Sequence, residues 1–211
     1  MTRIVKKIRW TAKMTVLTGL HIGGSKESVE IGGIDNPVIK MATKSGQPYI
    51  PGSSLKGKMR CLLEQVNGAT QVGGCELVNK LFGYSEKNLP SKIIVRDAFL
   101  TRDCEEWLRN CSSLDMPYTE NKFENTIDRI KGIAEHPRQT ERVPAGAEFN
   151  VEIVINVWDT DDEQELLHLL EQGTALLEND YLGGNGSRGY GQVTFSAPET
   201  VALTPDNNWK A

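Results

Sequence analysis

The clearest indication of the fold is the stretch Glu148-Phe-Asn-Val-Glu-Ile-Val-Ile-Asn-Val-Trp158. Its apolar residues alternate with polar ones, which predicts a core strand with one fully buried face. A helix is expected directly after it, capped by Asp159 or Thr160 and running through Leu177, because leucines recur there at helical spacing. The segment 3–18 also alternates and is rich in Ile, Val, Thr and Trp, so it predicts a second long strand.

Further elements are expected between and after these two strands. Ser53 and Ser54 are the predicted N-cap residues of a helix over 55–66. Shorter elements are a helix through Leu77 and Leu81, a helix over 103–111, and extended pieces at 28–40, 93–95 and 192–196. The mixed polar segment 112–145, with extended runs at 122–127 and 139–143, predicts a protruding arm or hairpin.

Without its insertions, the predicted order is β-α-β-β-α-β. This order predicts an α+β fold with a ferredoxin-like or RRM-like core, a frame shared by many proteins that bind single-stranded RNA. We expect one RRM-like domain over 1–211, with helical or lid insertions at about 67–91 and 102–117. The protruding hairpin is expected at about 118–145.

The charge of the chain is unevenly distributed. Its 24 Lys and Arg against 28 Asp and Glu give a formal net charge of −4, which by itself argues against a nucleic-acid binder. However, residues 1–60 hold 11 basic and 3 acidic side chains, whereas residues 145–211 hold 2 and 12. This distribution predicts a basic face for an anionic ligand, and an acidic helix turned to solvent or to a basic partner.

The cysteines and the N-terminal segment predict a cytoplasmic protein. The opening Met1-Thr-Arg-Ile-Val-Lys-Lys7 lacks the apolar region of a secretory signal, and the longest apolar stretches are too short to cross a membrane. The four cysteines are therefore expected to be reduced. Cys75, Cys104 and Cys111 could form a zinc site with one histidine, but their spacing is not that of a zinc finger. Buried apolar thiols are the simpler interpretation.

A glycine-serine turn precedes the basic helix. The segment Gly52–Lys58 fits the first seven positions of a P-loop, but Met59 stands where Ser or Thr would hold Mg²⁺. A Gly-Ser-Ser turn at a helix N-terminus, beside Lys56, Lys58 and Arg60, is instead typical of a generic phosphate site. A capped basic surface helix is the alternative.

A second glycine-rich motif, Gly184–Gly189, matches G-x-G-x-x-G. A dinucleotide site needs a strand before this motif and a helix after it, and here the order is reversed. The flanking Tyr181 and Tyr190 and the internal Arg188 suit the close approach of a sugar-phosphate backbone. A flexible loop is the alternative.

Asp35 is the candidate catalytic residue. It lies in Ile31-Gly-Gly-Ile-Asp-Asn-Pro37 and is one of only three acids in the basic first quarter. A lone carboxylate in a basic field can hold Mg²⁺ or take a proton from a hydroxyl. An Asx turn is the alternative. His21 follows the first strand at a Gly-Gly break, where a polar contact with a ligand is plausible.

Four stretches together resemble one family. They are Thr18–Gly24 with Gly33–Ile39, Tyr49–Arg60, Tyr181–Gly191, and Phe123–Arg129 through Glu141–Gly146. In this order and spacing they resemble the repeated backbone subunit of the type III-A CRISPR (Csm) interference complex, of the RAMP superfamily. The resemblance covers essentially the whole chain, although Asn67–Gly74 and the cysteines lie outside the shared motifs.

The resemblance implies a metal-dependent endoribonuclease that binds a guide CRISPR RNA as a helical filament and cuts complementary target RNA at regular intervals. A thumb-like hairpin, roughly Tyr118–Val143, would pass through the guide–target duplex and displace a nucleotide. The implied cofactor is Mg²⁺ or another divalent cation. The implied partners are the guide CRISPR RNA, the target RNA, further copies of the chain, and other Csm subunits. These subunits include the large polymerase/cyclase subunit, the small subunit and the subunit that caps the 5′ end of the guide; no membrane is involved.

The resemblance places the cleaving acid on Asp35, which would either bind the metal or activate the 2′-hydroxyl. The predicted RNA-binding residues are His21, Gly23, Gly24, Ser53, Ser54, Lys56, Lys58, Arg60, Phe123, Asn125, Arg129, Gly184, Gly186, Ser187 and Arg188. Three alternatives remain: a non-catalytic RNA-binding scaffold of the same kind of complex, a P-loop nucleotide enzyme, and an isolated RNA-recognition module with sequence preference.

Overall fold

A long antiparallel strand pair forms the centre of the molecule. The computed structural model describes residues 2–24, 34–44 and 46–210, so residues 28–33 of the extended piece expected at 28–40 lie outside the described residues. Strand β1 (Ile4–Val16) pairs with β7 (Glu148–Trp158) along almost the whole length of both strands. Both long strands predicted from alternation are confirmed.

Shorter strands extend this pair on both sides. Strands β8 (Val193–Phe195) and β9 (Glu199–Leu203) pair with the outer edge of β1, while β3 (Ile93–Val95) and β4 (Ala98–Leu100) pair with the outer edge of β7. Strand β2 (Tyr49–Ile50) pairs with β4, and all these pairs are antiparallel. The predicted α+β class is confirmed. Strands β2, β4 and β9 were not predicted.

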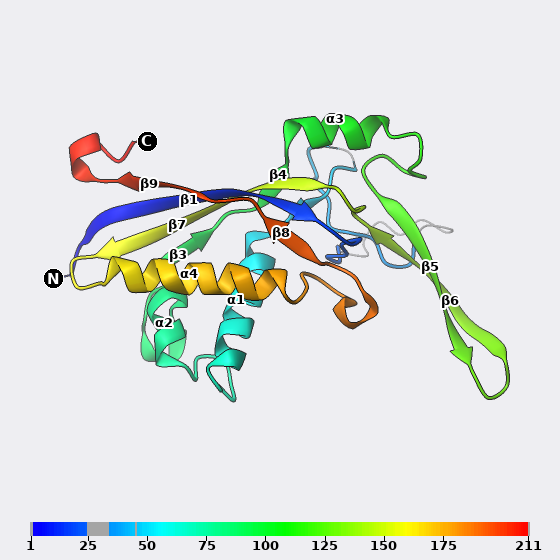
Figure 1. Cartoon of the computed structure of the whole chain (residues 1–211), viewed down its shortest axis with the longest axis horizontal. Helices are drawn as coiled ribbons and strands as arrows, with labels where there is room; N and C mark the ends of the chain where they lie inside the picture. The colour runs from blue at the N-terminus through cyan, green and yellow to red at the C-terminus, as the bar shows by residue number, and fades with distance from the viewer. Residues whose placement is uncertain (1, 25–33, 45, 211) are drawn as a thin grey trace.

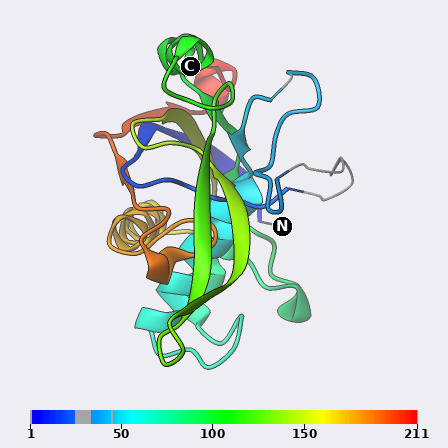
Figure 2. The ribbon, with the colours of Figure 1, turned by 90° about the vertical axis from the view of Figure 1, so that its right-hand side faces the viewer.

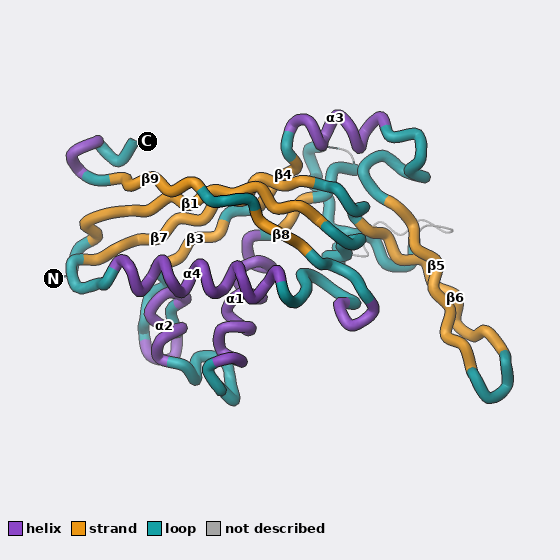
Figure 3. Tube along the Cα trace, in the orientation of Figure 1, coloured by secondary structure: helices purple, strands orange, loops and turns teal. Residues whose placement is uncertain are grey.

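Three helices cover one face of the sheet (Figure 1). They are α1 (Gly52–Val66), α2 (Glu76–Phe82) and α4 (Glu163–Glu178), whereas α3 (Arg102–Asn110) lies on the other side. The covered face carries Trp10 and Met14 of β1 and Phe149 and Ile155 of β7, which are almost fully buried. Short 3₁₀ turns occur at η1 (Ser85–Lys87), η2 (Gly186–Arg188) and η3 (Pro205–Asn207) (Figure 3). None of the helices in the described part combines the length and apolar character needed to cross a membrane.

A separate two-stranded hairpin projects beyond one end of the main sheet (Figures 1 and 2). It consists of β5 (Glu120–Asp128) and β6 (Ile133–Arg142), paired antiparallel. The predicted arm is thus a hairpin, with longer strands than expected at 122–127 and 139–143. Ile130, in the turn, is 98% exposed.

The predicted cap of the basic helix is wrong. Helix α1 begins at Gly52 after Pro51, and neither Ser53 nor Ser54 caps it. Instead the Gly52 N–H donates to Asp97 Oδ1 over 2.8 Å, so a carboxylate distant in sequence satisfies the first turn. Gly52 is required because a Cβ there would lie 2.2 Å from a backbone oxygen of Val95. The segment 52–58 is therefore helical, and it forms no phosphate-cradling loop.

The predicted cap of the second long helix is wrong by two or three residues. Asp162, and not Asp159 or Thr160, is the N-cap residue of α4, and its carboxylate accepts from the Gln164 and Glu165 N–H groups. The Asp161 carboxylate accepts from the Trp158 N–H over 2.9 Å and holds the preceding turn outside the helix.

Candidate nucleic-acid interface

Three segments that are far apart in the sequence meet at the end of the sheet where β1 ends. Leu20, after β1, exchanges two backbone hydrogen bonds with Val143 at the base of the hairpin. The Gly184 N–H donates to the His21 carbonyl over 2.8 Å. This bond places the glycine-rich loop, residues 183–191, beside His21. Gly183 makes this approach possible, because it has a φ of +77° and a Cβ there would lie 2.3 Å from the His21 oxygen.

The loop that carries Asp35 is fixed to the same place. Asp35 is exposed, and its Oδ2 accepts from the Gln139 N–H of β6 over 3.0 Å. The Glu141 N–H donates to the Asn36 carbonyl over 3.0 Å. The hydrogen bond from Gln139 thus joins the Asp35 carboxylate to the hairpin. Because Asp35 is exposed, its carboxylate remains accessible to a ligand.

Glu141 is the buried anchor of this loop. Its side chain is 0% exposed, yet its carboxylate has three partners. Val38 N–H donates to Oε2 over 2.9 Å, Thr119 Oγ1 donates to Oε1 over 2.7 Å, and Lys40 Nζ lies 2.6 Å from Oε1. These partners belong to the loop after Asp35 and to the start of the hairpin. Burying a carboxylate is costly unless it is paired, so Glu141 fixes both segments in one arrangement.

His21 lines an open polar cavity beside Asp35. The cavity has a volume of about 280 Å³ and is lined by His21, Asn36, Arg138, Thr140, Gly184 and Asn185. His21 Nδ1 lies 2.8 Å from the Glu141 carbonyl, which can only accept, so Nδ1 carries the proton. Nε2 is thus the ring nitrogen that remains for a ligand. The cavity therefore offers one guanidinium, one imidazole and a glycine-rich backbone to a polar ligand.

A hydrogen bond also links the glycine-rich loop to the hairpin. The hydroxyl of the buried Tyr190 donates to Glu124 Oε1 over 2.7 Å. Burial, reinforced by this hydrogen bond, raises the pKa of Tyr190 to about 12. The same bond is the main cause that lowers the pKa of Glu124.

Cations surround this Tyr190–Glu124 pair. Lys122 Nζ lies 4.4 Å and Arg142 Cζ 4.7 Å from the centroid of the Tyr190 ring. Arg138 and Arg188 lie 3.3 and 3.9 Å from the Glu124 carboxylate. Arg142 also pairs with Glu120, so these four cations face the carboxylates of Glu120 and Glu124. The local balance is positive, which suits a phosphate backbone.

The predicted basic residues of α1 point to two different sides. Lys56 and Arg60, one turn apart, face the segment before β3, where Lys56 Nζ donates to Ser91 Oγ over 2.8 Å. Lys58 faces the glycine-rich loop instead, 3.1 Å from Asp180 Oδ2 and 3.6 Å from the centroid of the Tyr181 ring. The structure thus separates Lys58 from the other two. Ser53 is exposed and Ser54 half-buried in the first turn.

The other predicted RNA-binding residues lie in two groups. Gly23, Gly24, Gly184, Gly186, Ser187 and Arg188 gather around His21 and the glycine-rich loop. Phe123, Asn125 and Arg129 lie along the hairpin and are exposed, Phe123 by 69%. Gly186 is required, because a Cβ there would overlap the ring of Tyr181.

Among the residues that the structure describes, the cysteines and the acids form no preformed metal site. Cys104 is buried, its Sγ accepts from the Glu148 N–H, and burial raises the pKa of its thiol. Within residues 2–24, 34–44 and 46–210, no three His, Cys, Asp or Glu side chains are grouped so that they could hold a metal ion. Asp35 alone is nevertheless compatible with Mg²⁺, which keeps several waters and takes one or two carboxylates plus substrate phosphates.

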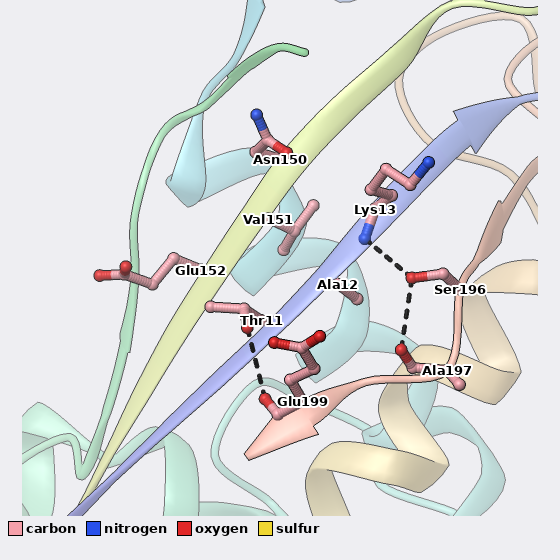
Figure 4. Close-up of a pocket in the computed structure, with 9 residues that line it drawn as sticks. All are labelled: Thr11, Ala12, Lys13, Asn150, Val151, Glu152, Ser196, Ala197 and Glu199. Carbon is pink, nitrogen blue, oxygen red and sulfur yellow. Dashed lines mark hydrogen bonds between the residues drawn. The ribbon is translucent and has the colours of Figure 1, made fainter. Parts of the chain in front are cut away.

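A larger cavity, of about 340 Å³, lies on the sheet face that α1, α2 and α4 leave open (Figure 4). Its charged side chains are Lys13, Glu152 and Glu199. Two carboxylates against one ammonium do not favour a polyanion, so this cavity carries no argument for RNA.

Comparison with known proteins identifies the family. The model of the RAMP superfamily matches residues 13–194. Proteins named CRISPR system Cms endoribonuclease Csm3 are similar over most of the chain. The one from Methanocaldococcus jannaschii is 47% identical, over 84% of this chain and 74% of its own. Those from Enterococcus italicus and Streptococcus thermophilus are each 43% identical, over 90% of this chain and 89% and 87% of their own.

Solved structures agree with this similarity. A chain in the crystal structure of the Csm3–Csm4 subcomplex of the type III-A CRISPR-Cas interference complex is 31% identical, with a TM-score of 0.63. The match covers 98% of this chain and 84% of that chain. A chain of the type III-B Cmr-beta complex bound to cognate target RNA has a TM-score of 0.66 at 17% identity, a likeness of fold alone. The chain therefore belongs to the RAMP superfamily and, within it, to the Csm3 family, which confirms the resemblance found in the sequence.

The burial of Glu141 leads to a testable prediction about the stability of the protein. Glu141→Gln removes the charge that faces Lys40 and should lower the free energy of unfolding by about 1–3 kcal/mol, since breaking a buried pair costs more than breaking an exposed one. Urea denaturation measures the change. The control is Glu148→Gln, which breaks the exposed pair with Lys13 and should cost at most about 1 kcal/mol. Equal losses in the two variants would contradict the anchoring role.

The raised pKa of Tyr190 predicts a pH dependence. The folded protein favours the neutral phenol, so this contribution to stability is complete below the unfolded pKa of about 10 and is lost as pH rises toward 12. Tyr190→Phe should be less stable by about 1–2 kcal/mol at pH 8, because the bond to Glu124 is lost. The difference between the two proteins should narrow as the pH rises from about 10 toward 12 in urea denaturation. Parallel curves would contradict the assignment.

Proposed function

We propose that this chain is the repeated guide-binding subunit of a type III-A CRISPR complex and cuts complementary target RNA. The observation that carries the proposal is the exposed Asp35 carboxylate, held by Gln139 at the base of the hairpin and beside the cavity of His21. It is supported by relatives that are named endoribonucleases and match nine-tenths of the chain at 43% identity.

Each part of the fold has a role in this proposal. The strand order β8–β1–β7–β4, with α1 and α4 in the two crossings, supports a ferredoxin-like core. The hairpin β5–β6 would be the thumb that enters the guide–target duplex, and its exposed Phe123 and Ile130 would contact bases. Base pairing would read the sequence, so the chain needs contacts only to the RNA backbone. His21, Lys56 and the glycine-rich loop would supply them.

We further propose that cleavage uses the 2′-hydroxyl of a nucleotide that the thumb displaces. A displaced nucleotide is freed from A-form geometry, so its 2′-oxygen can align with the adjacent phosphorus. The 2′-oxygen bonds to phosphorus, the bond to the 5′-oxygen breaks, and the products are a 2′,3′-cyclic phosphate and a 5′-hydroxyl. Asp35 would orient the 2′-hydroxyl or take its proton, and water would protonate the leaving oxygen. A divalent cation on Asp35 would stabilise the charge on the phosphate.

The proposal extends to partners and compartment. Guide RNA, target RNA, further copies of the chain and other Csm subunits are the proposed partners, in line with the complexes in which similar chains occur. The four free thiols support the cytoplasm as the compartment. A non-catalytic scaffold of the same complex is the alternative, and Asp35 separates the two.

Replacing the acid tests the catalytic part of the proposal. Asp35→Ala in the assembled complex should leave target binding within about threefold and reduce cleavage by roughly 100-fold or more. Wild-type cuts should appear at regular spacing and disappear with EDTA. Gel mapping of end-labelled target RNA measures both. The control is Asp206→Ala in η3, an exposed acid near the opposite end of the sheet, which should cut normally. Undiminished cutting by Asp35→Ala would favour the scaffold.

Replacing the lysine tests the binding part. Lys56→Ala should weaken guide binding and lower the slope of log K against log salt by about 1, because one phosphate contact is lost. Fluorescence anisotropy at several salt concentrations measures the slope. Lys80→Ala is the control, since Lys80 is paired with Glu165 of α4, 2.8 Å away. An unchanged slope for Lys56→Ala would exclude this lysine from the phosphate contacts.

A further inference from the structure

A second cavity lies beside Lys56, on the side of α1 that faces away from the glycine-rich loop. It has a volume of about 510 Å³, and we name it the α1–η1 pocket. Its lining residues are Arg60, Val72, Phe82, Gly83, Tyr84, Ser85, Glu86, Leu89 and Ser91. Most of them belong to the inserted segment 67–91, which the family motifs of the sequence do not include. The size is in the range of a pocket for a small ligand.

Arg60 is fixed in this pocket before any ligand binds. Its Nε donates to Glu64 Oε1 over 2.9 Å and its Nη2 to Asn79 Oδ1 over 3.0 Å. Glu64 and Asn79 are buried, and both also bond to the backbone of Gly73 over 2.8 Å. The Arg60 side chain remains 18% exposed. The Glu64 carboxylate already pairs with the Nε side of the guanidinium, so a further anion would contact its remaining N–H groups. A guanidinium held in this way loses little entropy when it binds a ligand.

Two cations lie next to each other at this pocket. Lys56 is one helical turn before Arg60, and its Nζ reaches Ser91 of the pocket lining. Burial, reinforced by the charge of Arg60, lowers the pKa of Lys56. Like charges at this spacing repel each other, and while Arg60 is paired with Glu64, the described bond of Lys56 is to the neutral Ser91 hydroxyl. A phosphate there would relieve both the repulsion and the desolvation.

The rest of the pocket suits a base and a sugar. The ring of Tyr84 covers the backbone of Gly73, where a Cβ would lie only 2.3 Å from the ring, so the ring has a fixed place. Val72 and Leu89 are exposed apolar side chains of the same pocket. The Tyr84 hydroxyl donates to Glu86, whose carboxylate can also accept from a ribose hydroxyl. An aromatic ring with apolar neighbours and adjacent cations is typical of single-stranded nucleic-acid sites.

We propose that the α1–η1 pocket binds one unpaired nucleotide of the RNA that runs along Lys56, with its phosphate on Arg60 and Lys56 and its base against Tyr84. The inserted segment thereby adds an RNA subsite that the hairpin and the glycine-rich loop do not provide. This inference rests on the proposed RNA-binding function.

Photo-crosslinking tests the site directly. The probe is guide RNA with 5-iodouridine in place of uridine, in the assembled complex, and mass spectrometry locates the crosslinked peptides. We expect a crosslink at Tyr84, and it should persist in the Asp35→Ala complex. Crosslinks confined to the hairpin and the glycine-rich loop would overturn the subsite and leave the proposed function intact. A complex without any crosslink to this chain would overturn both.

Affinity measurements with matched variants test the stacking. Anisotropy with a labelled oligouridine and the full chain should show roughly 5- to 100-fold weaker binding for Tyr84→Leu. Tyr84→Phe keeps the ring and should bind within about twofold. Val72→Ser changes an exposed residue that folding does not require and should bind roughly 2- to 5-fold more weakly. Wild-type affinity of both Tyr84→Leu and Val72→Ser would overturn the subsite.

Discussion

The antiparallel pairing of β1 with β7 determines where the other segments of the chain lie. Because the two strands run in opposite directions, the chain after β1 and the chain before β7 emerge at the same end of the sheet. Strand β8 pairs antiparallel with the last residues of β1, so the glycine-rich loop before β8 also lies at this end. Three segments that are far apart in the sequence therefore meet at this end, although no local pattern in the sequence predicts that they do.

Glu141 converts this proximity into a fixed geometry. A buried carboxylate with donors from Val38, Thr119 and Lys40 holds the loop of Asp35 and the base of the hairpin as one unit. A hairpin that shifts on binding RNA would therefore move Asp35 with it. The pair of Tyr190 and Glu124 extends the same unit to the glycine-rich loop. The proposed thumb and the proposed cleaving acid are thus parts of one rigid assembly, and the acid keeps its position relative to the nucleotide that the thumb displaces.

The sequence predicted the strands and helices that follow a local repeat of apolar residues. It missed the features that depend on residues far away in the chain. Alternation was sufficient for β1 and β7, and helical periodicity for α4. The cap of α1 was missed because its partner, Asp97, lies 45 residues away. Glu141 carries no local signal, since an acid in a polar hairpin is usually exposed. The separation of Lys58 from Lys56 and Arg60 was predictable, because residues two apart face different sides of a helix.

The acidic last third illustrates why net charge is a poor guide to binding. We expected the acids of α4 to face solvent or a basic partner, but two of them, and two acids that flank the helix, are paired within the chain. Asp161, Glu163, Glu165 and Asp180 pair with Lys92, Lys6, Lys80 and Lys58, respectively. These pairs neutralise four of the twelve acids in residues 145–211. The potential at a ligand site then depends on the nearby cations, such as Lys56 and the cations of the hairpin base. Since the field of a site falls off within about 8–10 Å in physiological salt, such local cations decide where a phosphate backbone binds.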